Sequence, residues 1–136
     1  MARILALHDT LIIQNNEESI RFSMKIYHNP RCSKSRQALQ LIREQGLEPE
    51  IILYLESPPT KTELRDILQK LGKNAADILR KGEADYKAHF AAISRTDEKA
   101  LIDLLVAYPK VIERPIVVSG AKAVIGRPPE AISVLF

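Results

Sequence analysis

The hydrophobic pattern predicts a strand–helix–strand unit at residues 25–55. Residues 25–28 form a short run that predicts a strand, and apolar positions from Ala38 to Ile42 recur at helical spacing. Gly46 is a typical helix stop. Residues 50–55 are rich in β-branched and apolar residues and predict a second, buried strand. This spacing predicts that the two strands are parallel.

The middle of the chain predicts three helices in one block. Thr60 and Glu63 form a capping box, which predicts a helix that ends at Gly72. Asn74 predicts the cap of a second, short helix, and Thr96 predicts the cap of a third. The block separates two parts of the chain that form sheet.

The end of the chain predicts two strands and a helix. Residues 115–118 and 122–125 predict strands, and the short turn between them implies an antiparallel hairpin. Pro115 stands at the start of a strand, where its missing N–H is tolerated. A helix over 131–136 follows. The predicted order is βαβ, helical block, ββα.

Residues 1–23 differ from the rest of the chain. Their apolar runs are too short for a membrane span, and they lack a clear signal-peptide core. We expect the folded domain to be 24–136, with Met24 as the functional start and 1–23 as a mis-assigned start or a disordered, dispensable extension. The alternative is an added strand, at 3–7 or 10–13, that pairs with a sheet edge.

Composition narrows the class of protein. The 136 residues suggest one domain, and a net charge of +3 is mild. A small anionic substrate suits this charge, and no basic segment interleaved with aromatic residues indicates nucleic acid. With one cysteine no internal disulfide is possible, so we expect a reduced, cytoplasmic compartment. No cluster has metal-ligand spacing, so no metal is expected.

The single cysteine, Cys32, lies between the first predicted strand and the first predicted helix. Unpaired backbone N–H groups and the positive end of the helix dipole favour its thiolate, which is the nucleophile. Arg31, Lys34 and Arg36 act in the same direction. The alternative is a small buried hydrophobic residue, as most free cysteines are.

Four segments carry a family resemblance. Residues 28–36, 54–60, 114–118 and 126–130 resemble, in order and spacing, the signature segments of the glutaredoxin-coupled arsenate reductases (ArsC-like). The resemblance covers 24–136. It implies an α/β fold of the thioredoxin/glutaredoxin type, with a mixed sheet and an inserted helical block.

The resemblance also implies a set of site residues. The catalytic cysteine of the family falls on Cys32, and two arginines that hold the oxyanion fall on Arg114 and Arg127. A third family arginine is aligned here with Lys61, which keeps the positive charge but lacks the planar guanidinium that binds an oxyanion through two hydrogen bonds. His28 matches a histidine associated with lowering the pKa of the cysteine.

Two further residues support this site. Pro115 matches the cis-proline position of thioredoxin-like folds. Ser35 stands where a C-x-x-C motif has its second cysteine, and the alternative is a helix-capping hydroxyl, a role that Ser33 could also fill. For the arginines, Lys61 and His28 the alternative is an ordinary solvated side chain.

The resemblance implies arsenate reduction with external thiols. The Cys32 thiolate attacks arsenic(V), glutathione reduces the adduct, a glutaredoxin resolves the intermediate, and arsenite leaves. No second cysteine is present to resolve an intermediate, so glutathione is expected as co-substrate rather than a bound cofactor. We expect a monomer that binds neither membrane nor nucleic acid. The alternatives are a glutathione-dependent thiol oxidoreductase with another substrate, and a non-catalytic redox regulator of the RNA-polymerase-binding type. Ser35 and Arg127 weigh against the regulator.

Overall fold

The computed structural model describes residues 24–136, and its centre is one four-stranded mixed sheet with the order β2-β1-β3-β4. The strands are β1 (Met24–Tyr27), β2 (Glu50–Ile52), β3 (Ile116–Ser119) and β4 (Lys122–Ile125). β1 and β2 are parallel, and β3 pairs antiparallel with both β1 and β4. The predicted α/β fold with a mixed sheet is confirmed. The predicted extension 1–23 lies outside the described residues.

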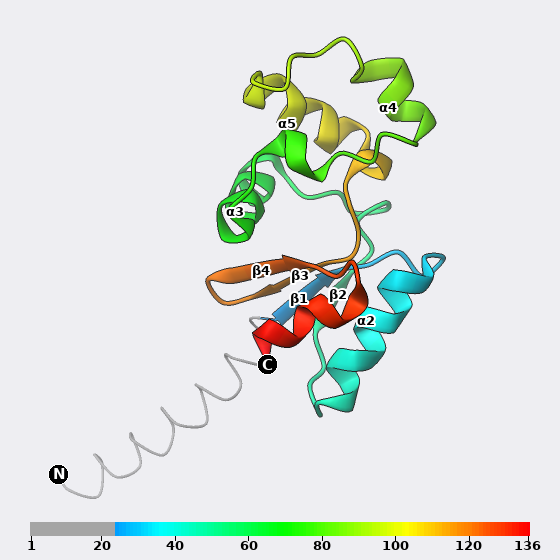
Figure 1. The fold of residues 1–136 in the computed structure, drawn as a ribbon, viewed down its shortest axis with the longest axis vertical. Helices are drawn as coiled ribbons and strands as arrows, with labels where there is room; N and C mark the ends of the chain where they lie inside the picture. The colour runs from blue at the N-terminus through cyan, green and yellow to red at the C-terminus, as the bar shows by residue number, and fades with distance from the viewer. Residues whose placement is uncertain (1–23) are drawn as a thin grey trace, which may run out of the picture.

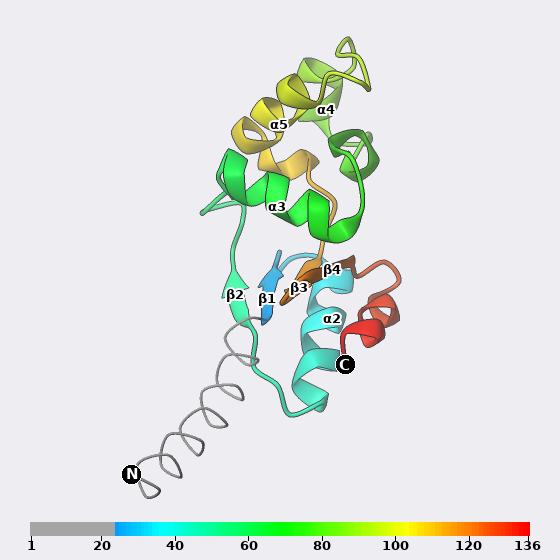
Figure 2. The ribbon, with the colours of Figure 1, turned by 90° about the vertical axis from the view of Figure 1, so that its left-hand side faces the viewer.

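Helices cover the sheet in two groups (Figures 1 and 2). The α-helices are α2 (Ser33–Glu44), α3 (Lys61–Leu71), α4 (Ala84–His89) and α5 (Glu98–Ala107). The 3-10 helices are η1 (Ala75–Ile78), η2 (Pro109–Val111) and η3 (Pro129–Leu135). The helices α3, α4 and α5 gather at one end of the molecule, whereas η3 packs beside α2. Among the described residues, no helix is long and apolar enough to cross a membrane.

Two hydrophobic cores lie on opposite faces of the sheet. Successive strand residues point to opposite faces, so Ile26 and Val117 pack with α2 and η3, whereas Tyr27, Ile116 and Val118 pack with the helical block. The alternation in β1 and β3 therefore sorts the helices into two layers. The site described below lies where both layers meet the end of β1.

β2 is an exposed edge strand, which corrects the prediction of a buried one. In the described sheet it pairs only with β1, and Glu50 and Ile51 are exposed. The strand also ends at Ile52 rather than at residue 55, because the chain turns at 53–57. The apolar run suggested burial on both faces, but an edge position leaves much of the strand open to solvent.

Helix starts were predicted with mixed success. The Thr60 capping box is confirmed: the Thr60 hydroxyl accepts from the Glu63 N–H at 3.1 Å, and the Glu63 side chain accepts from the Thr60 N–H. The cap of α5 is Asp97 rather than Thr96. The helix α4 was not predicted because it has no buried residue, so its sequence lacks an apolar stripe.

Candidate active site

Cys32 is the N-cap residue of α2, a role predicted for Ser33 or Ser35. Its backbone is extended, and the helix begins at the next residue. The sulfur therefore lies beside the first backbone N–H groups of the helix, which have no partner within the helix. The thiol is partly buried, so a reactant can reach it.

The surroundings of Cys32 favour the thiolate. Burial alone raises the pKa of the Cys32 thiol, but hydrogen bonds from the Ser35 N–H, the Arg114 guanidinium and the Lys34 N–H outweigh it. The charge of Arg114 adds to this effect, and the pKa lies below its ordinary value. The prediction of an activated thiol at a helix start is consistent with this geometry.

Ser35 ties the loop before Cys32 to the helix. It is fully buried, and its Oγ accepts a hydrogen bond from the Asn29 N–H at 3.1 Å. The same Oγ pairs with His28 Nδ1 at 2.6 Å. Ser35 is thus a buried connector between β1 and α2 rather than a helix cap.

His28 contacts this connector through its Nδ1. Burial, with the charges of Arg43 and Arg36, lowers the pKa of His28, so its ring is neutral at physiological pH. The groups that lower the pKa of Cys32 are backbone N–H groups and Arg114, and His28 is not among them. The contact that links His28 to the Cys32 loop is its hydrogen bond with Ser35.

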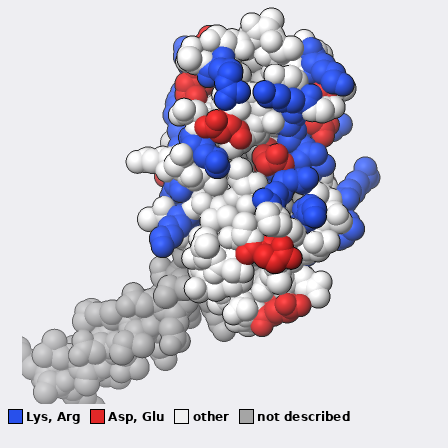
Figure 3. Space-filling model, in the orientation of Figure 1, with Lys and Arg blue, Asp and Glu red and all other residues white. Residues whose placement is uncertain are grey.

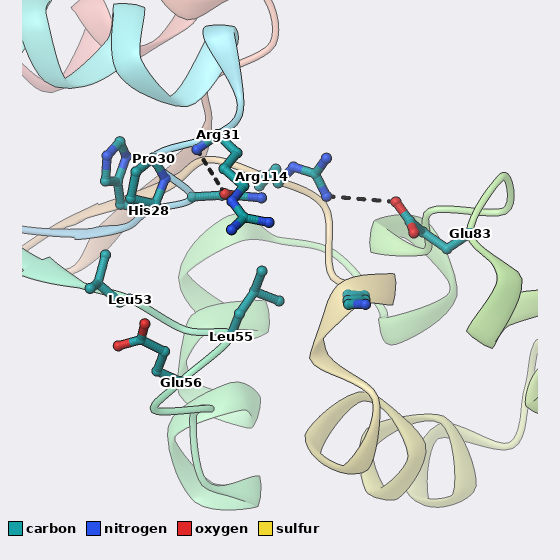
Figure 4. A pocket seen from close by; sticks show the side chains of 10 residues that line it. His28, Pro30, Arg31, Leu53, Leu55, Glu56, Glu83 and Arg114 are labelled. Atoms are coloured by element: carbon teal, nitrogen blue, oxygen red, sulfur yellow. Dashed lines mark hydrogen bonds and ion pairs between the residues drawn. The ribbon is translucent and has the colours of Figure 1, made fainter.

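Arg114 is the cation closest to the chemistry. It precedes Pro115, and the Arg114–Pro115 peptide bond is cis, as the resemblance implied; the Arg127–Pro128 bond is cis too. The Arg114 guanidinium interacts with the Cys32 thiol. Its Nη1 lies 3.7 Å from Glu83 (Figure 4). Its Nε is buried without a hydrogen-bond partner.

Two more arginines join Arg114 in one cluster. Arg80 Nη1 donates to Glu113 Oε1 at 2.8 Å, and Arg80 Nε lies 3.4 Å from Glu83. Arg127 Nε lies 3.6 Å from Glu113 Oε1, and Arg127 Nη1 donates to the Arg114 carbonyl at 3.4 Å. The structure therefore brings together the two arginines expected at the site and adds Arg80.

Lys61, the residue aligned with the third family arginine, lies outside this cluster. Its Nζ forms an ion pair with Asp103 at 3.0 Å, between the start of α3 and α5. Arg80 is the third arginine of the cluster. An antiparallel bridge between Leu79 and Ile112 places Arg80 beside Glu113.

A hollow of about 410 Å³ opens beside the Cys32 loop (Figure 4). Its walls come from residues 28–31, from the turn that contains Leu53 and Leu55, and from Glu83, Lys110 and Arg114. On the face of the molecule that Figure 3 shows, Lys and Arg side chains are spread with Asp and Glu between them. Within 24–136, no group of three His, Cys, Asp or Glu is placed to hold a metal ion.

Tyr54 is a buried residue of the site that the sequence did not single out. Its Oη has no hydrogen-bond partner, and burial raises its pKa while the nearby charge of Arg114 opposes that rise. Cys32 lies close enough to contribute as well. Tyr54 stands within a segment that carried the resemblance, but nothing in its pattern distinguished it from a core residue.

The fold and the site define a class: a thioredoxin-like protein with an activated cysteine at a helix N-terminus and arginines around it. The model of the ArsC family matches residues 27–135, and the chain belongs to that family.

Relatives match most of the chain. "Uncharacterized protein YfgD" of Escherichia coli K12 is 54% identical over 80% of this chain and 92% of its own. An arsenate reductase of Neisseria meningitidis is 44% identical over 80% of this chain and 94% of its own. The solved structure of an arsenate reductase from Vibrio cholerae has a TM-score of 0.79 at 42% identity, covering 85% of this chain and 98% of that one.

Proposed function

We propose that this protein is a cytoplasmic arsenate reductase that uses Cys32 as its nucleophile and glutathione and glutaredoxin as external reductants. The observation that carries the proposal is the thiol with a lowered pKa against Arg114 at the start of α2. Relatives named arsenate reductase support the substrate. The mild positive charge of the chain suits an anionic substrate.

In the proposed reaction, Cys32 Sγ forms a bond to arsenic(V), and an oxygen leaves as hydroxide or water. A glutathione thiol adds to the arsenic and displaces a second oxygen. The glutaredoxin thiolate then attacks the glutathione sulfur, forming a mixed disulfide. The electron pair of the broken sulfur–arsenic bond stays on arsenic, which becomes trivalent. Hydrolysis of the Cys32–arsenic bond releases arsenite and the free thiol.

The arginines offset the repulsion between a thiolate and an oxyanion. Arg114 contacts the sulfur and has a buried, unpaired Nε–H, so it serves as the principal oxyanion ligand. Arg80 and Arg127 add positive charge behind it. His28 and Ser35 hold the loop that precedes Cys32.

A coupled assay tests the proposal. Arsenate is supplied with glutathione, a glutaredoxin, glutathione reductase and NADPH, and oxidation of NADPH is followed. Arsenate-dependent oxidation that is lost in Cys32→Ser and kept in Ser33→Ala supports the proposal. A flat trace from folded protein with a reactive thiol refutes it.

A second candidate is a glutathione-dependent thiol oxidoreductase that acts on an organic substrate. The observation that favours it is the hollow of about 410 Å³, which is much larger than a tetrahedral oxyanion. Reduction of a small glutathione mixed disulfide, with no response to arsenate in the same assay, selects this candidate.

A further inference from the structure

One carboxylate oxygen meets three arginine residues. Glu113 Oε1 accepts from Arg80 Nη1 at 2.8 Å and from the Arg114 backbone N–H at 3.2 Å, and it lies 3.6 Å from Arg127 Nε. Oxygen atoms of a bound oxyanion are usually held by donors that converge in this way. In this chain, a side chain of the protein itself occupies that position.

The position of Glu113 is fixed by the backbone. The Glu113 N–H donates to the Ile78 carbonyl at 2.9 Å, and the Arg80 N–H donates to the Val111 carbonyl at 2.8 Å. These bonds flank the bridge between Leu79 and Ile112 and hold the carboxylate and the guanidinium together. Both side chains are mostly buried, so the pair is poorly screened by solvent.

The charges of the cluster nearly cancel. Three guanidinium groups face two carboxylates, those of Glu83 and Glu113. One net positive charge is left, and the Cys32 thiolate balances it. Within this cluster an arriving dianion therefore meets no surplus of positive charge, whereas a monoanion costs less to accept. Arg31 and Lys110 on the wall of the hollow, opposed by Glu56, add one positive charge outside the cluster.

We propose that Glu113 is a specificity-determining residue, an internal anion that weakens oxyanion binding at the Cys32 site and favours singly charged over doubly charged oxyanions. The inference rests on the proposed function in one respect: the substrate is an oxyanion that approaches Cys32. In Glu113→Gln the amide oxygen keeps an acceptor for Arg80 and the side chain keeps its shape, but the negative charge is removed.

The test measures anion binding without turnover. Alkylation of Cys32 by iodoacetamide is followed at increasing sulfate or perchlorate, two tetrahedral ions that differ in charge. Removal of a fixed negative charge acts twice as strongly, in free energy, on a dianion as on a monoanion. We expect Glu113→Gln to lower the dissociation constant of sulfate about tenfold and that of perchlorate about threefold.

Two control variants separate charge from shape. Glu48→Gln removes a carboxylate that pairs with Arg43 at the far end of α2, and it should leave both constants within twofold. Glu113→Asp keeps the charge and should keep sulfate binding weak. Circular dichroism and thermal unfolding of each variant establish that it is folded.

Three outcomes are decisive. Unchanged or weaker sulfate binding by folded Glu113→Gln overturns the inference, and so does equal tightening for both ions. Failure of wild-type protein to reduce arsenate, with sulfate binding tightened in Glu113→Gln, rejects the proposed function and leaves this inference standing.

Discussion

Ser35 offers the sharpest test of how the site is held, through the substitution Ser35→Ala. The change removes one buried oxygen that accepts from the Asn29 N–H at 3.1 Å and pairs with His28 Nδ1 at 2.6 Å. Both groups lie in buried surroundings, since His28 and Asn29 are less than a tenth exposed. Without the hydroxyl, both lose their partner.

The magnitude follows from these two orphaned groups. A buried polar group left without its hydrogen bond costs about 1–3 kcal/mol. The lower half of the combined range applies, because the oxygen leaves a small space into which the loop can relax. The free energy of unfolding should therefore fall by about 2–4 kcal/mol.

Urea unfolding, followed by circular dichroism, measures the loss. Ser33→Ala is the matched control, because Ser33 is exposed in the first turn of the same helix. Its change should stay within about 0.5 kcal/mol. A loss below about 0.5 kcal/mol in Ser35→Ala as well would refute the connector role and return Ser35 to an ordinary helix position.

Three further predictions concern the cations and the backbone around them. Arg114→Met should raise the pKa of Cys32, because a contacting positive charge is lost, and the pH dependence of alkylation should move to higher pH. An unchanged profile would leave the helix start as the sole cause of the lowered pKa. Arg80→Gln should raise the KM for arsenate about tenfold, whereas Lys61→Gln should leave the KM within twofold, because only Arg80 joins the cluster. A rise for Lys61→Gln without one for Arg80→Gln would identify Lys61 as the third oxyanion ligand. Gly126→Ala should lower the melting temperature by several degrees, because its Cβ would lie 2.8 Å from Cγ of Pro115. An unchanged melting temperature would show that the proline ring moves aside at little cost.

The parts of the fold predicted from sequence are those set by local patterns. The βαβ unit, the hairpin and the Thr60 cap each depend on residues close together in the chain, and all three are present. Cys32 was identifiable for the same reason, since its neighbours and the helix start are local. The burial of β2 was wrong because its place at the sheet edge depends on the order of all four strands.

The cation cluster could not be predicted because its contacts are distant in sequence. Arg80 and Glu113 are 33 residues apart and meet only through the bridge between two loops. Arg80 also follows apolar Ile78 and Leu79 at the end of an expected short helix. In sequence it therefore resembled an ordinary charged residue on the solvent-exposed face of an amphipathic helix. Lys61 was favoured by its alignment with a family arginine directly after the signature segment 54–60, but at the capped start of α3 its side chain pairs with Asp103.

The two hydrophobic cores give the site a further property. Cys32 belongs to α2, which packs on one core, whereas Arg80 and Glu113 are tied to the helical block on the other. Proteins often open locally in cooperative units, and we expect the two cores to be such units. Opening of the helical block alone would withdraw part of the charge around Cys32 while the sulfur stays at its helix start. The reactivity of the Cys32 thiol should therefore report partial unfolding of the helical block, and it can be compared with amide hydrogen exchange.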